Sequence, residues 1–287
     1  MAAQIIIYGI ITGILYGLVA AGLSLLFGVM RYMNIAHGSF LVIGGYISYW
    51  FFTLWHVDPF VSIPIVMLAM FLLGLIVYKV SFSPLRKFPE GQRLGNSMLI
   101  TFGLILVLDN VMCLLWTSDA RGITTSYSKV IFELLGVRLP LISLAVIGVT
   151  LLVIIALHLF LNRTYFGKSI RATAQNWEAA SLLGINIDRT YLVACGVSMA
   201  LAGAAGSAVV LMYSITPYSG LQWLLTALVV LVLAGLGSIK GIFLAGVLLG
   251  IAEQASVFFI GGEYRSVVGL GIFVLILLLK PQGLFRQ

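Results

Sequence analysis

The chain has 287 residues, of which 61% are hydrophobic and only 9% are charged. Soluble domains carry about 25% charged residues, so this composition excludes an ordinary water-soluble fold and makes the lipid bilayer the solvent. The formal net charge is +7, but the basic residues gather in a few loops between apolar runs. This distribution fits a membrane protein and argues against a nucleic-acid-binding stripe.

Apolar runs near the length of a transmembrane helix recur along the whole chain. The candidates are Gln4–Met30, Gly38–Trp55, Phe60–Val80, Gly95–Thr117, Leu139–Leu161, Thr190–Tyr213, Leu221–Leu236, Ile242–Ile260 and Ser266–Leu279. The seventh is short enough for a re-entrant segment, and the polar segments between runs are too short for a core of their own. The sequence predicts an all-α polytopic transmembrane helix bundle of about eight to nine membrane segments. Residues 1–287 form a single transmembrane domain.

Lys and Arg collect in three regions, which the positive-inside rule places in the cytoplasm. These regions hold Arg86, Lys87 and Arg93, then Arg163, Lys168, Arg171 and Arg189, then Lys280 and Arg286. The loop Ser118–Arg138 carries charges of both signs and is expected outside. The N-terminus is then outside and the C-terminus inside.

Small residues repeat every four positions on several runs. Gly9, Gly13, Gly17 and Ala21 give the first run one smooth face, and a later run carries Gly246 and Gly250. Small residues let helix backbones approach closely in lipid. We expect most of these faces to pack within the bundle, and a share in an interface with a second membrane subunit remains open.

The segment from Gly28 to Gly38 has two interpretations. It is a tight interfacial turn with Arg31 reaching toward head groups, or a pair of broken helix ends facing a cavity. In the second case Asn34, His37 and Gly38 cap those ends. Composition favours the turn.

Polar side chains inside apolar runs are candidates for a translocation path. Asp109, Asn110 and Glu253 are the main ones, and Asn34 and His37 join them if the second interpretation holds. Each of the three could equally bond to a neighbouring helix for structure alone.

Residue patterns for chemistry are missing. Phe166–Ser169 ends like a phosphate-binding loop, but Asn162 stands where that motif needs a glycine. No His, Cys or carboxylate cluster has metal-ligand spacing, and no serine has an evident histidine partner. We therefore expect no catalytic residue, no cofactor and no metal site.

The most informative region is the polar loop 163–189, expected to be a cytoplasmic coupling loop. Its alanines favour helix, and Gly184 supplies the residue past the helix end. Ala179 and Ala180 form a low profile that can enter a groove on a soluble partner, with Glu178 and Arg171 as polar contacts at the rim. Asp188 is expected to cap the next helix.

The pattern Glu178-Ala179-Ala180, then three residues and Gly184, resembles the cytoplasmic signature of permease subunits of bacterial ABC importers. Further stretches are similar to the branched-chain amino acid branch of that family. They are Gly28–Met30, Asn34–Gly38, Arg171–Asn176, Gly184–Arg189, Gly235–Ser238 and Lys280–Phe285. The chain departs from the fuller signature, which continues to Ile-x-Leu-Pro; here Ile185 to Asp188 follow the glycine.

This resemblance implies a multi-pass protein of a bacterial inner membrane that pairs with a second permease subunit. It also implies two cytoplasmic ATPase subunits, which dock at Glu178, Ala179, Ala180 and Gly184 and supply the energy, and an external solute-binding protein. The expected cargo is a branched-chain or other small apolar amino acid, with urea, short amides and aromatic acids left open.

Two other classes compete with this reading. An ion- or proton-coupled secondary transporter would also use broken helices near the midplane. An intramembrane enzyme is disfavoured by the missing nucleophile and metal ligands.

Overall fold

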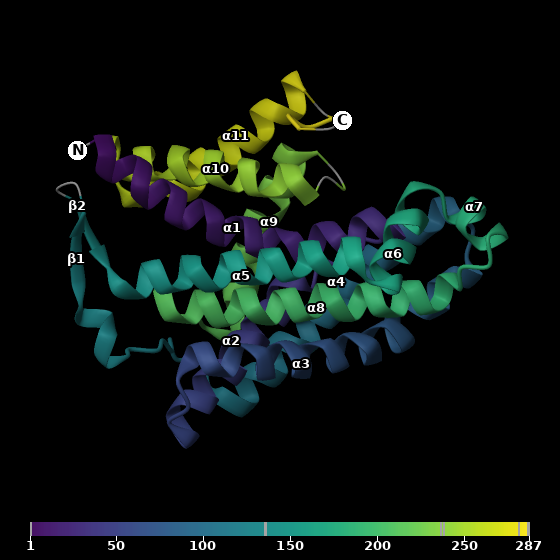
Figure 1. The fold of residues 1–287 in the computed structure, drawn as a ribbon, viewed down its shortest axis with the longest axis horizontal. Helices are drawn as coiled ribbons and strands as arrows, with labels where there is room; N and C mark the ends of the chain where they lie inside the picture. Colours follow the sequence, from purple (N-terminus) through teal and green to yellow (C-terminus); the bar gives the residue numbers. More distant parts are fainter. Residues whose placement is uncertain (1, 135–136, 236, 238, 281, 286–287) are drawn as a thin grey trace.

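The computed structural model describes residues 2–134, 137–235, 237, 239–280 and 282–285. In that part of the chain, long helices run side by side along one axis (Figure 1), and eight of them are long and apolar enough to cross a membrane. The sheet in these residues is one hairpin of β1 (Ile131–Leu134) and β2 (Val137–Pro140). The predicted all-α bundle is confirmed.

The predicted runs correspond to helices with small shifts at their ends. The second run is α2, which has the length of a span at 19 residues but is not among the eight, and its first half is buried. Leu236 and Arg286 lie outside the described residues. The long helices are α1 (Ala2–Met30), α2 (His37–Trp55), α3 (Pro59–Val77), α4 (Glu90–Trp116), α5 (Leu141–Arg163), α8 (Ile187–Met212), α9 (Gly220–Ala234), α10 (Ile239–Phe259) and α11 (Arg265–Leu279).

Shorter helices extend or connect these. A π-helical turn and a 3-10 turn prolong α3, so its span runs to Lys87 without a break. The short elements are η1 (Tyr78–Phe82), η2 (Ser83–Lys87), η3 (Ser126–Lys129), α6 (Tyr165–Gln175), α7 (Trp177–Leu182), η4 (Pro217–Ser219) and η5 (Gly262–Tyr264).

Burial separates central helices from peripheral ones. In the apolar windows of α1 and α8, 83% and 89% of residues are buried, against 17% for α4 and 11% for the span that contains α11. The core is therefore built around α1 and α8, while α4 and α11 turn apolar side chains outward, as lipid-facing helices do.

The glycine stripe of α1 lies directly against α10. A Cβ atom on Gly13 would come within 2.4 Å of the Cα atom of Val247, and one on Gly250 within 2.3 Å of the carbonyl oxygen of Gly9. No side chain larger than hydrogen fits at either position. The expectation that these small residues pack within the bundle is confirmed.

The segment Arg31–Ala36 is irregular, with a turn at Ile35 and Ala36, and it packs against α4. The backbone N–H of Met33 donates to Ser97 Oγ at 3.0 Å, and that of Ile35 donates to Thr101 Oγ1 at 3.1 Å. Apart from Arg31, its residues are buried or half-buried. The interfacial-turn interpretation is wrong, because the turn is buried and hydroxyls of α4 satisfy backbone groups that an interfacial turn would leave to water.

After this segment, α2 starts within the bundle and not at its edge. A Cβ atom on Gly38 would lie 1.9 Å from the carbonyl oxygen of Gly220, so the first turns of α2 and α9 touch. Two helix N-termini, each with the positive end of its dipole, therefore meet in the interior. The helix breaks as in the second interpretation, but Asn34, His37 and Gly38 do not cap it, because the N-cap of α2 is Ala36 and has no side-chain hydrogen bond.

The β hairpin and α7 lie at opposite ends of the long axis (Figure 1), as expected for loops on opposite sides of a membrane. At the hairpin end, the hydroxyl of Tyr127 donates to Asp58 Oδ2 at 2.8 Å and ties the loop to the start of α3. Burial and this hydrogen bond raise the pKa of Tyr127 to about 12, so its hydroxyl stays a donor at neutral pH.

We predict that Gly13→Ala destabilises the bundle, because its methyl group overlaps the backbone of α10; overpacking costs about 1–3 kcal/mol. Thermal unfolding of the purified chain in nanodiscs measures the effect. The matched control is Gly148→Ala on α5, where an added Cβ meets nothing within 4 Å and helix propensity improves by up to about 1 kcal/mol. Equal melting temperatures for the two variants would contradict the close approach.

Candidate functional site

The segment 163–189 starts where α5 ends, and its first helix, α6, is fixed tightly. Thr164 Oγ1 accepts a hydrogen bond from the N–H of Gly167 at 3.0 Å, which caps α6. A Cβ atom on Gly167 would lie 2.1 Å from the carbonyl oxygen of Phe160. Glycine therefore lets α6 fold back onto the end of α5.

The next helix, α7, is short and capped at both ends. Asn176 Oδ1 accepts from the N–H of Ala179 at 3.0 Å. At the other end, the N–H of Ile185 donates to the carbonyl of Ala180 at 3.1 Å and that of Gly184 to Ser181 at 3.0 Å. Gly184 has φ +81°, so this is a Schellman motif. The predicted short helix closed by Gly184 is present.

The faces of α7 differ from the prediction in one respect. Arg171, Glu178, Ala179 and Gly184 are exposed, but Ala180 is only 2% exposed. Ala180 therefore anchors α7 to its own chain, and the expectation that it enters a partner's groove is wrong.

Leu182 and Leu183, which sequence reasoning passed over, are 89% and 82% exposed. The sequence does carry a signal for this surface, because two adjacent leucines in a polar loop, when exposed, commonly mark an interaction site. The protruding apolar surface of α7 is this pair and not the alanines.

Asp188 does not cap α8. The cap is Asn186, whose Oδ1 accepts from the N–H of Arg189 at 3.0 Å. Asp188 instead accepts hydrogen bonds from the Tyr78 hydroxyl and from Arg86, both at 2.5 Å. Either Asn or Asp can cap a helix, so the two nearby arginine and tyrosine donors decide the outcome. The result is an ionic contact between the start of α8 and the prolonged α3.

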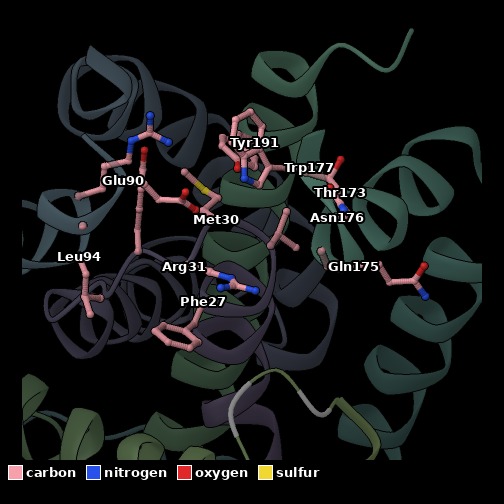
Figure 2. A pocket seen from close by; sticks show the side chains of 15 residues that line it. Phe27, Met30, Arg31, Glu90, Leu94, Thr173, Gln175, Asn176, Trp177 and Tyr191 are labelled. Carbon is pink, nitrogen blue, oxygen red and sulfur yellow. The ribbon is translucent and has the colours of Figure 1, made fainter. Parts of the chain in front are cut away.

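Two cavities flank α7, of about 380 Å³ and about 430 Å³, and Trp177 borders both. Figure 2 shows the first: the guanidinium of Arg31 lies near its centre, Thr173 and Asn176 lie on one side, and Glu90 on the other. Within α7 only Ala180 is buried. With one buried residue and open volume on two sides, α7 is only loosely held against the rest of the chain.

The predicted path residues divide into separate groups. Asn34 and His37 are 0% and 1% exposed, and His37 Nε2 lies 3.0 Å from the carbonyl oxygen of Val19. Both amide atoms of Asn34, and Nδ1 of His37, have no hydrogen-bond partner among the described residues. Unpaired buried amides are uncommon in native proteins, which marks Asn34 as a residue whose role is not packing alone.

Asp109 belongs with this first group, and Asn110 does not. Asp109 Oδ1 accepts from Ser39 Oγ at 2.7 Å, which places it at the start of α2. Asn110 is exposed on the other face of α4, and its amide donates to the carbonyl of Leu106 in its own helix at 2.7 Å. Helical periodicity sends consecutive residues in different directions.

Glu253 lies in a second cluster, formed by α1, α10 and α11. Its carboxylate accepts from the Tyr16 hydroxyl at 2.6 Å and from Arg265 Nε at 2.9 Å. Sequence reasoning missed Arg265, although a lone arginine at the start of the last span is the natural partner for a buried glutamate. Across the described residues, no group of three or more His, Cys, Asp or Glu is placed to hold a metal ion.

The family model of the branched-chain amino acid transport system permease component matches residues 5–277. The chain is 32% identical to the high-affinity branched-chain amino acid transport system permease protein BraD of Pseudomonas aeruginosa, over 99% of this chain and 95% of the relative.

Two further relatives agree. The chain is 28% identical to the permease protein LivH of Escherichia coli K12, over 97% of this chain and 94% of the relative. It is 25% identical to the permease protein LivM of Salmonella typhimurium, over 94% of this chain and 67% of the relative. The chain therefore belongs to the permease components of branched-chain amino acid transport systems.

Proposed function

We propose that this chain is the membrane-spanning permease subunit of an ATP-driven importer in a bacterial inner membrane. It carries branched-chain or other small apolar amino acids that an external binding protein delivers. The observation that carries this proposal is α7: a short helix, capped at both ends, that holds Leu182 and Leu183 in water at the end of the bundle opposite the hairpin. An exposed apolar pair on a rigid support is suited to a groove on a soluble partner.

The partners follow from the family and from this surface. Relatives named LivH and LivM are both similar to this chain, which supports a pair of permease subunits in one importer. The cytoplasmic surface of α6 and α7, with Arg171 and Glu178 beside the leucines, is our proposed docking site for an ATPase subunit, one on each permease.

The mechanism we propose is alternating access. ATP binding brings the ATPase subunits together, α7 moves with them, and the motion reaches the bundle through α6 and through the contact of Asp188 with Arg86. Inside, the non-helical Arg31–Ala36 segment and the touching starts of α2 and α9 form the irregular backbone that changes shape. Asn34, His37 and Asp109 border the cargo route there, and Glu253 borders it on the α10 side.

The energy source is tested by uptake of labelled leucine in cells that lack other leucine transporters and express this chain with its companion subunits. We expect uptake to stop when ATP is depleted and to continue when ion gradients are collapsed. Uptake that follows the ion gradient and ignores ATP would instead establish an ion-coupled secondary transporter.

The docking surface is tested by Leu182→Asp with Leu183→Asp. Both side chains are exposed, so the bundle should fold, and the copurified ATPase should fall at least tenfold, or about 1.4 kcal/mol of binding. The control is Ile131→Asp with Phe132→Asp, which puts the same two charges at adjacent exposed apolar positions of the hairpin, at the opposite end of the bundle. Normal copurification with the double variant would show that the leucines do not dock the ATPase.

The route is tested by Asn34→Ala. The Asn34 amide has no hydrogen-bond partner among the described residues, so removing the amide should leave thermal stability unchanged or slightly raised. Leucine uptake should fall several-fold. The matched control is Asn162→Ala at the end of α5, where the amide bonds only to His158 and uptake should stay normal. Full uptake by Asn34→Ala would remove Asn34 from the route.

A further inference from the structure

A polar cavity of about 230 Å³ lies between the first turns of α9 and α11 and the later part of α10. Its walls carry one carboxylate, one guanidinium and several aromatic rings. Its polar lining includes Tyr16, Tyr213, Gln222, Glu253, Arg265 and Ser266. This cavity is distinct from the two that flank α7, because it shares no lining residue with them.

The two charges are paired, but they do not use all of their hydrogen-bonding groups. Glu253 Oε2 receives both the Tyr16 hydroxyl and Arg265 Nε, and Arg265 Nη2 donates to the Tyr16 hydroxyl at 2.7 Å. Arg265 Nη2 also donates to the Tyr213 hydroxyl at 3.5 Å, and no hydrogen bond within the described part of the chain uses Glu253 Oε1 or Arg265 Nη1. The side chains of Arg265 and Glu253 are only 27% and 7% exposed, and a buried ion pair is stable only when its other donors and acceptors are hydrogen-bonded. The unused N–H and oxygen beside the cavity are therefore available to a ligand.

The cavity continues into a small apolar recess of about 60 Å³. The two spaces share Gln222, Thr226, Glu253 and Ser266, and beyond them the recess is bordered by Leu225, Val229, Leu249 and Leu270. Gly269 keeps the junction open, because a Cβ atom there would lie 2.8 Å from Glu253 Oε1. A ligand held by the ion pair would therefore place an adjoining apolar group in the recess.

An aliphatic α-amino acid has this distribution of chemistry. Its carboxylate matches the forked N–H groups of arginine, its ammonium group matches a carboxylate, and both sit on the carbon that carries the side chain. The rings of Tyr16 and Tyr213, 5.9 Å and 5.8 Å from the guanidinium carbon, hold Arg265 in place from two sides.

We propose that Glu253 and Arg265 form a binding site for the zwitterionic head of an aliphatic amino acid, with its side chain in the recess between α9, α10 and α11. This deepens the proposed function and rests on it for the identity of the cargo. In this site Arg265 binds the carboxylate, Glu253 binds the ammonium group, and the recess selects the side chain.

The test measures ligand binding to the full chain in nanodiscs by saturation-transfer NMR. The probes are leucine, leucinamide, which lacks the carboxylate, and 4-methyl-2-oxopentanoate, which lacks the ammonium group. We expect the wild type to bind leucine at least tenfold more tightly than either analogue.

Variants make the assignment specific to each charge. Glu253→Gln should lower the affinity for leucine at least tenfold and leave the affinity for the oxo acid unchanged. Arg265→Gln should lower the affinities for leucine and for the oxo acid and leave the affinity for leucinamide unchanged. Because these residues also join α10 to α11, Thr226→Leu offers a variant at a half-exposed position that fills the junction. This variant should lower the affinity for leucine several-fold and the affinity for glycine much less.

The matched control is the double variant Glu133→Gln with Arg138→Gln. This pair has the same residue types and the same 2.9 Å contact, but it lies exposed on the hairpin and should change no affinity. The proposal is overturned if leucine gives no signal above empty nanodiscs, or if each charge variant weakens all three probes equally. Leucine binding without ATP-dependent uptake would keep this site and reject the proposed importer. ATP-dependent uptake without leucine binding to this chain would reject the site alone.

Discussion

Backbone contact between α1 and α10 is the constraint on which the rest of the bundle depends. A bilayer gives no hydrophobic drive between helices, so α1 is held by the close approach that Gly13 and Gly250 allow. That approach puts the Tyr16 hydroxyl within reach of Glu253 on α10. It also fixes the far end of α1, from which the non-helical Arg31–Ala36 segment enters the interior.

Non-helical backbone inside a membrane needs partners for its polar groups, and α4 provides some of them. The hydroxyls of Ser97 and Thr101 accept hydrogen bonds from the N–H groups of Met33 and Ile35. Because this segment is supported from one side by hydroxyls and not by a helical ladder, α2 can begin in the interior beside α9. The irregular backbone, the unpaired Asn34 amide and the Ser39–Asp109 hydrogen bond are consequences of the same arrangement.

Much of the fold could be read from the sequence, because each membrane segment needs a long apolar run and each close contact needs small residues. The hairpin could not, since its short strands lie in a loop of mixed polarity. The path of Arg31–Ala36 was missed because its hydrogen-bond partners lie more than sixty residues away, beyond any local pattern. Periodicity likewise gave no hint that Ala180 would face inward and that Asn186 would replace Asp188 as the cap.

The leucine pair on α7 has a consequence for the life of the protein in the cell. Leu182 and Leu183 are almost fully exposed on a short helix. An uncovered apolar surface of this kind favours aggregation and recognition by quality-control proteases. In the proposed importer, a copy without its ATPase subunit would expose this pair and be degraded, which would link the abundance of the chain to that of the partner.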